Sequence, residues 1–188
     1  MDVPIPPTIL CLGTTGSGKS TLLRNLQLKD DPSQARETVP TMGTNLSIIS
    51  RKKSTNPNDA LTKDDIVVVR EIGGTMVQLW PSFIEPINTR GILYVIDASE
   101  PESLGKATIH LLEFLNHPNL NENVEVLIVF SKTDIKCSRS LSEFKFIMRL
   151  NHIIASSKRY ISHLQFNAES QENQDKILEW CFKFSNFC

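Results

Sequence analysis

The stretch Gly13-Thr14-Thr15-Gly16-Ser17-Gly18-Lys19-Ser20, of the pattern G-x-x-x-x-G-K-S, decides the fold of this chain. The apolar run Ile9-Leu10-Cys11-Leu12 precedes it and predicts a strand, and residues 21–28 follow it with leucines at helical spacing. The glycines let the backbone turn tightly, so that consecutive N–H groups face inward at the positive end of the helix dipole. The stretch therefore predicts an anion site. The alternative is a glycine-rich turn without a ligand, which the flanking strand and helix disfavour.

The side chains at the end of this loop indicate which anion it binds. In a loop of this pattern, Lys19 would reach the β- and γ-phosphates of a nucleoside triphosphate. The Ser20 hydroxyl would be a ligand of the Mg²⁺ ion that bridges those phosphates. The phosphate-binding residues predicted around this loop are Gly13, Thr14, Thr15, Gly16, Ser17, Gly18, Lys19, Ser20 and Thr21.

The composition is that of an ordinary globular protein. The chain has 188 residues, 40% of them hydrophobic and 22% charged, and this length suits one buried core, so we predict one domain over residues 1–188. Within it, residues 1–7 would be a short N-terminal extension, and the polar residues 51–65, with Asn56-Pro57-Asn58, would be a flexible loop. The net charge of −1 gives no electrostatic preference for nucleic acid. We expect a monomer that binds a small molecule.

Cysteine usage and the termini predict the compartment. The four cysteines are scattered without C-x-x-C spacing, as in reduced cytosolic proteins. Residues 1–7 lack a positively charged n-region, and no apolar run approaches the ~18 residues that span a bilayer. We therefore expect a cytoplasmic protein without a stable membrane anchor. Lipidation of Cys188 is left open, although C-a-a-X prenylation needs three residues after the cysteine.

Six segments predict the strands of one sheet: four are apolar runs, residues 45–50 alternate between polar and apolar, and residues 161–166 give a weaker strand signal. They occupy residues 9–12, 45–50, 66–69, 92–96, 124–130 and 161–166. The wholly apolar residues 66–69 predict a strand that is buried on both faces. Because helical segments alternate with these runs, the sequence predicts the α/β fold class with a mostly parallel sheet.

Helix signals lie between the strands. Leucines recur at helical spacing over residues 104–115, behind Pro101, and predict a crossover helix between parallel strands. Ser140-x-x-Glu143 predicts a capping box that opens one further helix, with apolar residues on one side as far as Ile154. Apolar residues over 177–184 predict a C-terminal helix.

A second stretch, Phe130-Ser131-Lys132-Thr133-Asp134, indicates which base the nucleotide carries. It follows an apolar strand and resembles the guanine-reading N-K-x-D box of small GTPases, with Ser131 in place of the asparagine. The Asp134 carboxylate can accept hydrogen bonds from guanine N1–H and the N2 amine, whereas adenine has no such pair of donors. Lys132 would lay its aliphatic stem along the purine face.

A shorter stretch, Asn167-Ala168-Glu169, is similar to the S-A-K-type loop of the same proteins. In that loop the Ala168 N–H would meet guanine O6. Taken alone, the triplet is more typical of an ordinary surface turn. The resemblance gives as guanine-binding residues Ser131, Lys132, Asp134, Asn167 and Ala168.

Two further stretches resemble the switch loops of the Arf family of small GTPases. Thr38-Val39-Pro40-Thr41-Met42-Gly43-Thr44-Asn45 is similar to switch I, where Thr41 would bind Mg²⁺ and sense the γ-phosphate. Arg70-Glu71-Ile72-Gly73-Gly74-Thr75 is similar to switch II. There the Gly74 N–H would contact the γ-phosphate, and Glu71 would hold a Mg²⁺-bound water. The metal set implied is Ser20, Thr41 and, through water, Glu71.

The resemblance covers residues 9–184 and implies the small-GTPase fold, a P-loop NTPase fold whose six-stranded, mostly parallel sheet has helices on both faces. It implies GTP or GDP and Mg²⁺ as cofactors. Its partners would be effectors bound through the switch loops, an exchange factor and an activating protein, with intracellular or ciliary traffic as the setting.

The chain departs from the family pattern where hydrolysis is concerned. The water-orienting glutamine falls on Thr75, whose hydroxyl is too short to take its place, so intrinsic GTP hydrolysis is expected to be slow. The residues assigned to catalysis are Thr75, Gly74 and Lys19. Ser131 lacks the amide that braces the nucleotide pocket, which predicts weaker guanine specificity.

Three hypotheses for the function follow. The first is a guanine-nucleotide switch of the Arf-like type with weak intrinsic hydrolysis. The second is a non-hydrolysing, GTP-bound scaffold. The third is an ATP-using kinase, which the Asp134 box opposes.

Overall fold

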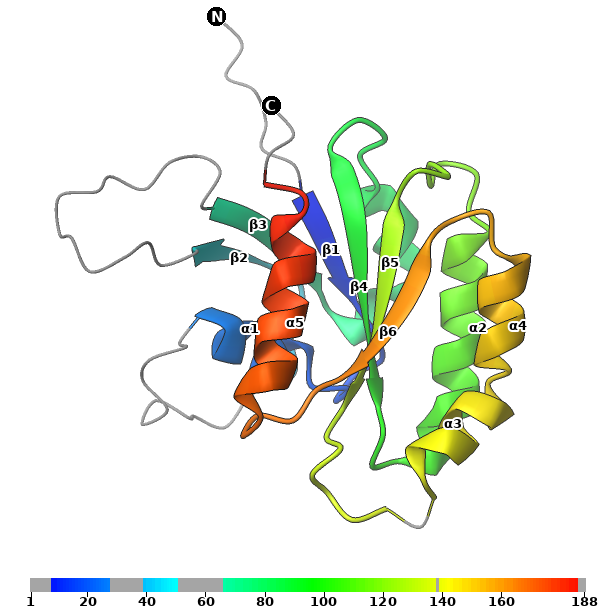
Figure 1. Cartoon of the computed structure of the whole chain (residues 1–188). Coiled ribbons are helices and arrows are strands. Elements are labelled where there is room, and N and C mark those ends of the chain that lie inside the picture. The colour runs from blue at the N-terminus through cyan, green and yellow to red at the C-terminus, as the bar shows by residue number, and fades with distance from the viewer. Residues whose placement is uncertain (1–7, 28–38, 51–65, 138, 186–188) are drawn as a thin grey trace, which may run out of the picture.

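The computed structural model describes residues 8–27, 39–50, 66–137 and 139–185. Six strands form one sheet in the order β2-β3-β1-β4-β5-β6 (Figure 1). The strands are β1 Thr8–Leu12, β2 Thr44–Ser50, β3 Ile66–Ile72, β4 Thr89–Asp97, β5 Glu125–Ser131 and β6 Ile161–Gln165. Neighbouring strands are parallel except β2 and β3, which are antiparallel. The predicted α/β class with a mostly parallel sheet is confirmed.

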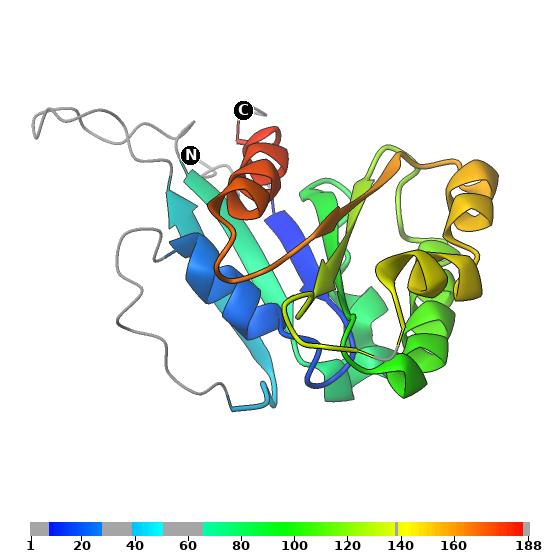
Figure 2. The same cartoon turned by 60° about the horizontal axis from the view of Figure 1, so that its bottom comes forward.

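Helices cover both faces of this sheet, as predicted. The helical segments are α1 Lys19–Gln27, η3 Gly74–Phe83, η4 Pro101–Ser103, α2 Leu104–Leu115, α3 Leu141–Ile147, α4 Leu150–Ser156 and α5 Gln171–Phe182. Helices α1 and α5 lie over one face, and α2, α3 and α4 lie over the other (Figures 1 and 2). The crossover helix predicted for residues 104–115 has these bounds in the structure.

Strand β1 is fixed from both faces, because its side chains alternate between two cores. Ile9 and Cys11 pack in the core that α1 and α5 cover, while Leu10 and Leu12 pack in the core that α2 and α4 cover. Each such fully buried leucine or isoleucine contributes roughly 1.5–3 kcal/mol to folding. The loop that follows Leu12 therefore starts from a rigid position.

The strand order places that loop at a crevice of the sheet. Strand β1 pairs with β3 on one side and with β4 on the other. From β1 the chain passes through α1 on one face toward the β2 edge of the sheet, and it reaches β5 and β6 through α2, α3 and α4 on the other face (Figure 2). In open α/β sheets, such a reversal of strand order opens a ligand-binding crevice at the carboxyl ends of the strands.

The segment after Ser140 differs from the single helix that the sequence predicts. The capping box is confirmed, because Ser140 Oγ accepts a hydrogen bond from Glu143 N–H at 3.3 Å and Glu143 Oε2 accepts one from Ser140 N–H at 2.6 Å. The helix ends at Ile147, however, and a second helix begins at Leu150. Arg149 adopts a left-handed conformation with φ 52°, which cannot continue a right-handed helix.

Strand β3 also differs from its prediction. Val67 and Val69 are buried, but Ile66 and Val68 are only half-buried, so the strand is not covered on both faces. On that second face the core includes Ile72 but neither Ile66 nor Val68, because the helices there pack over the middle of the sheet. The apolar run therefore faces a core on one side and partly solvent on the other.

Several expectations concern residues outside the described part of the chain. They are the N-terminal extension over 1–7, the flexible loop over 51–65, Thr38 of the switch I stretch and Cys188. Among the described helices, none is long and apolar enough to cross a membrane.

Candidate functional site

The loop between β1 and α1 takes the conformation that its glycines permit. Gly13, Gly16 and Gly18 have φ values of 146°, 78° and 87°. These positive angles are costly for residues with a side chain. At Gly13 a Cβ atom would also lie 2.3 Å from the carbonyl oxygen of Val95 in β4, so the loop fits closely against the neighbouring strand.

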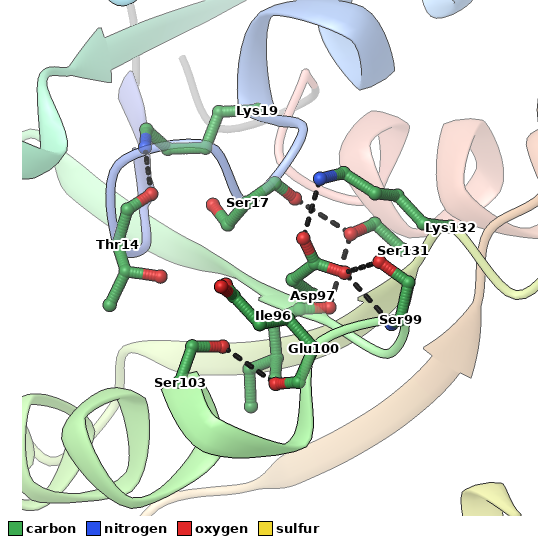
Figure 3. Close-up of polar contacts among 10 residues, drawn as sticks. All are labelled: Thr14, Ser17, Lys19, Ile96, Asp97, Ser99, Glu100, Ser103, Ser131 and Lys132. Atoms are coloured by element: carbon green, nitrogen blue, oxygen red, sulfur yellow. Dashed lines mark hydrogen bonds and ion pairs between the residues drawn. The ribbon is translucent and has the colours of Figure 1, made fainter. Parts of the chain in front are cut away.

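Lys19 lies inside this loop as a buried cation. Its Nζ donates hydrogen bonds to the carbonyl oxygens of Gly13 and Thr14, both at 2.9 Å; Figure 3 shows the bond to Thr14. Burial lowers the pKa of Lys19, while the Glu71 carboxylate acts in the opposite direction. Burial also raises the pKa of the Cys11 thiol, which is therefore neutral. Within the described residues Lys19 has no ion-pair partner, so an anion in the loop would compensate its charge.

Three oxygen atoms from three segments meet beside the loop. Ser20 Oγ donates a hydrogen bond to Glu71 Oε1 at 2.5 Å, Thr41 Oγ1 donates one to the same oxygen at 3.1 Å, and the two hydroxyl oxygens are 3.2 Å apart. Mg²⁺ prefers such hard oxygen ligands, at about 2.0–2.1 Å, and a carboxylate supplies the balancing charge. The predicted metal set therefore fits Mg²⁺, with Glu71 nearly inaccessible at 2% exposed.

Two consecutive glycines bring the predicted switch stretches and the loop together. Gly73 N–H donates to the Gly43 carbonyl at 2.8 Å, and a Cβ at Gly73 would lie 2.3 Å from the Thr41 carbonyl oxygen. A Cβ at Gly74 would lie 2.2 Å from the Thr15 backbone nitrogen. We call Gly73 and Gly74 the glycine pair. Only residues without a side chain fit at these two positions.

A tryptophan fixes the glycine pair from the other side. Trp80 Nε1 donates to the Gly73 carbonyl oxygen at 3.2 Å, and its ring is 1% exposed in an edge-on cluster with Tyr94, His110 and Phe114. Thr75, by contrast, follows the pair at the start of η3 and is exposed.

Ser131 ends β5 and contacts the loop between β1 and α1. Its hydroxyl donates to the Ser17 carbonyl oxygen at 2.6 Å, with the Ile96 carbonyl oxygen 3.1 Å away (Figure 3). The sequence suggested that the missing amide would leave this region unbraced. The serine hydroxyl does link β5 to the loop, although with a single donor.

The next residue, Lys132, extends toward β4. Its ammonium group forms an ion pair with Asp97 Oδ2 at 2.5 Å, and Asp97 Oδ1 accepts bonds from Ser99 N–H and Ser99 Oγ at 2.8 and 2.6 Å. Burial alone would raise the pKa of Asp97, but the hydrogen bonds from Lys132 and Ser99 outweigh it and lower that pKa. The carboxylate is therefore ionised at neutral pH.

The remaining predicted guanine residues lie at the same edge of the sheet. Because β5 and β6 are parallel, with Phe130 paired to Gln165, the segments after both strands are neighbours. Thr133 Oγ1 donates to the Phe166 carbonyl oxygen at 3.2 Å and joins them. Asp134 and Ala168 are both exposed, so they are accessible to a ligand. Gln174 of α5 holds the Ala168 carbonyl oxygen at 2.8 Å.

The structure thus gathers most of the predicted residues around one cleft but leaves some outside its walls. The predicted residues that line it are Thr15, Gly16, Gly18, Lys19, Ser20, Thr21, Thr41, Glu71, Gly74 and Lys132. The predicted residues that are not among its walls are Gly13, Thr14, Ser17, Thr75, Ser131, Asp134, Asn167 and Ala168.

Asp97 and Ser99 were missed at the sequence level. Their signal is positional, since Asp97 ends the apolar β4 run as Ser131 ends the β5 run.

Comparison with known proteins identifies a matching family and similar proteins of known sequence. The model of the ADP-ribosylation factor family matches residues 7–184. Over 178 residues the chain is 35% identical to ADP-ribosylation factor-like protein 16 of Homo sapiens, covering 91% of this chain and 82% of that protein. Over 151 residues it is 31% identical to ADP-ribosylation factor-like protein 4A of Homo sapiens, covering 79% of this chain and 69% of that protein.

Among solved structures, the Arl6 (BBS3) small GTPase of Trypanosoma brucei with the bound nucleotide analogue GppNp has the same fold. The TM-score is 0.73 over 96% of this chain and 98% of that chain, at 16% sequence identity.

Proposed function

This chain belongs to the ADP-ribosylation factor family of small GTPases, and from that premise we propose that its switch loops close around bound GTP and Mg²⁺ through Thr41 and Gly74. The surface formed by the closed loops would then be recognised by effector proteins. A small GTPase of this family is a GTP-binding switch, and Thr41 and Gly74 would operate the switch in this chain.

The glycine pair is the observation that carries this proposal. Gly73 packs against Thr41 and Gly43 of the switch I stretch, while Gly74 packs against Thr15 of the phosphate loop. A γ-phosphate in the loop would meet Gly74 N–H and the Thr41 side chain from two directions. Since the two stretches touch through backbone atoms, a shift of one displaces the other.

The buried Lys19 and the Ser20, Thr41 and Glu71 oxygens define how the phosphates would be held. Lys19 would exchange part of its carbonyl contacts for phosphate oxygens, and Ser20 and Thr41 would be metal ligands. When bound, Mg²⁺ neutralises charge on the β- and γ-phosphates. Asp134 would accept the paired donors of guanine, and Ala168 N–H would donate to its O6.

Hydrolysis is proposed to be slow because Thr75 stands where the family carries glutamine. Thr75 is exposed at the start of η3, and its short hydroxyl cannot orient a water molecule as an amide does. Gly74 and Lys19 would stabilise the transferring phosphoryl group, so an activating protein would supply the missing element. The second candidate, a persistent GTP-bound scaffold, is favoured by the same residue.

The first experiment identifies the nucleotide that copurifies with the protein. The protein is denatured, and the released ligand is chromatographed before and after incubation with Mg²⁺. GDP supports a hydrolysing switch, and GTP that persists for hours supports the scaffold. An adenine nucleotide would contradict the assigned role of Asp134.

Thr75→Gln is expected to increase hydrolysis. A small GTPase with the glutamine turns over at ~10⁻⁴ s⁻¹ without help, and we expect the wild-type chain to be about tenfold slower. The substitution should recover most of that difference in a single-turnover assay with radiolabelled GTP. Gln78→Ala, at another exposed η3 position, is the matched control and should leave the rate unchanged. A Thr75→Gln rate equal to the wild-type rate would show that the deficit lies elsewhere.

Glu71→Gln is expected to weaken Mg²⁺ binding. The change preserves shape but removes the charge that Ser20 and Thr41 face, and loss of such a supporting carboxylate costs about 10–100-fold in metal affinity. The measurement is the Mg²⁺ concentration that slows GDP release by half. Glu102→Gln, an exposed position on η4, is the control. The same Mg²⁺ dependence in both variants would argue against a metal role for Glu71.

We further propose that residues 1–188 act as one monomeric domain in intracellular or ciliary traffic. The sheet and both cores are continuous over the described residues, and the relatives are Arf-like proteins. Light scattering on the GDP and GTP-analogue forms tests the monomer. Imaging of the tagged chain in ciliated cells tests the setting, and exclusion from cilia and endomembranes would contradict it.

A further inference from the structure

Lys132 is held in a strained backbone conformation at the purine end of the cleft. Its φ of 56° lies in the left-handed region, which costs roughly 1–2 kcal/mol for a residue with a side chain. Such a conformation persists only where surrounding contacts determine it. It turns the side chain back across the carboxyl ends of the strands, toward β4 instead of β6.

The ammonium end of Lys132 is also held in place, by an ion pair with Asp97. Asp97 takes the charge at 2.5 Å, and the Asp97 side chain is only 6% exposed, against 34% for Lys132. Ser99 occupies the other carboxylate oxygen through two hydrogen bonds, so Asp97 cannot rotate away from the lysine (Figure 3). Bonds to a carboxylate are stronger than neutral ones, particularly where water is largely excluded.

Lys132 also forms part of the wall of the nucleotide cleft, and its methylene stem connects these two fixed ends. Lys132 lines the same cleft as Gly16 and Gly18 of the phosphate loop, while Asp97 is not among its walls. With both ends held, the stem loses the rotamer freedom that a free lysine would have to give up on binding, up to about 2 kcal/mol. It presents a preorganised apolar surface to a flat ring.

We propose that Asp97, itself oriented by Ser99, is a positioning residue that holds Lys132 as the platform for the guanine ring and thereby slows nucleotide release. This inference rests on the proposed guanine-nucleotide function of the cleft. It assigns Asp97 no contact with the nucleotide, because its effect passes through the Lys132 ammonium.

A structural role for Asp97 is the competing explanation. Asp97 and Ser131 are paired residues of β4 and β5, and Ala98 N–H donates to the Ser131 carbonyl oxygen at 3.0 Å just beyond them. Loss of Asp97 could therefore loosen the strand ends. Two readouts separate the explanations, since a structural effect is independent of Lys132 and lowers the melting temperature.

The test is a double-mutant cycle of Asp97→Asn and Lys132→Met in the full chain. Asp97→Asn keeps the shape but removes the charge, and Lys132→Met keeps an apolar stem without the ammonium. Dissociation of a fluorescent GDP analogue at fixed Mg²⁺ should be about tenfold faster in each single variant. The double variant should be no faster than Lys132→Met alone, because the two changes remove the same interaction. If Asp97→Asn speeds release by the same factor in the wild-type chain and in the Lys132→Met variant, the proposal is overturned.

Two measurements complete the design. Glu122→Gln removes the partner of Lys158 in an exposed ion pair, joined at 2.8 Å, and should leave release unchanged. Lysine-reactive labelling followed by mass spectrometry should show Lys132 modified several-fold faster in Asp97→Asn than in wild type. This labelling needs no nucleotide, so it reports the pair even if the wild-type chain fails to bind GDP, which would refute the proposed function alone. Unchanged labelling of Lys132 would refute the positioning by Asp97.

Discussion

Lys19→Ala is expected to lower the affinity for GTP and GDP about 300-fold. The wild-type ammonium is buried, hydrogen-bonded only to the carbonyls of Gly13 and Thr14, and without an ion-pair partner among the described residues. A bound phosphate would provide that partner, and removing one member of a buried charge pair costs about 2–5 kcal/mol. At about 1.4 kcal/mol per factor of ten, the middle of that range corresponds to this loss. Titration with fluorescent nucleotide analogues measures it.

The control for this variant is Lys176→Ala. Lys176 is exposed on α5 and pairs with Glu172 four residues before it, a type of pair worth about 0.3–0.5 kcal/mol. It should bind nucleotide as the wild type does. An affinity of Lys19→Ala within threefold of the wild type would mean that the loop between β1 and α1 does not carry the phosphates.

Gly74→Ala is expected to remove the preference for the triphosphate while leaving GDP bound. The new Cβ would lie 2.2 Å from the Thr15 nitrogen and 2.5 Å from the Thr14 carbonyl carbon, and neither backbone atom can move while α1 is in place. The pair would therefore lift off the phosphate loop. We expect the affinity for a non-hydrolysable GTP analogue to fall about 100-fold, with GDP affinity changed less than threefold.

Gly105→Ala is the matched control, because a Cβ there meets nothing within 4 Å. Gly105 lies in α2, where alanine is favoured over glycine by about 1 kcal/mol, so this variant should be at least as stable as the wild type. Its ratio of analogue to GDP affinity should not change. A parallel loss of both affinities in Gly74→Ala would indicate general damage to the loop and contradict the proposed role of the glycine pair.

Local patterns in the sequence predicted the elements and their class. The glycine loop, the helix over residues 104–115 and the capping box at Ser140 depend on neighbouring residues, and all three occur as predicted. The break at Arg149 was not predicted, because arginine is not a residue type that favours the left-handed conformation it adopts. The half-buried face of β3 depends in the same way on how far the helices extend over the sheet.

The candidate site shows the same difference between features that neighbouring residues determine and features that depend on the tertiary structure. Residues that act through a contiguous motif, such as Lys19 and Ser20, could be assigned from spacing alone. Asp97 could not, because its relation to Lys132 exists only through the parallel register of β4 and β5, which brings together residues 35 positions apart. The roles assigned to Thr75, Asp134 and Ala168 stay predictions that the experiments above address.

The glycine pair has a consequence for how proteins of this kind can vary. Positions 73 and 74 have no room for a side chain, since a Cβ at each would meet the backbone of another segment. Position 75, the next residue, is exposed. Under the role proposed for Thr75, a change there would alter how long the active state lasts without altering how that state is assembled. The lifetime of the active state and the coupling between the loops would thus depend on adjacent but separate residues, and a variant at position 75 would adjust the lifetime alone.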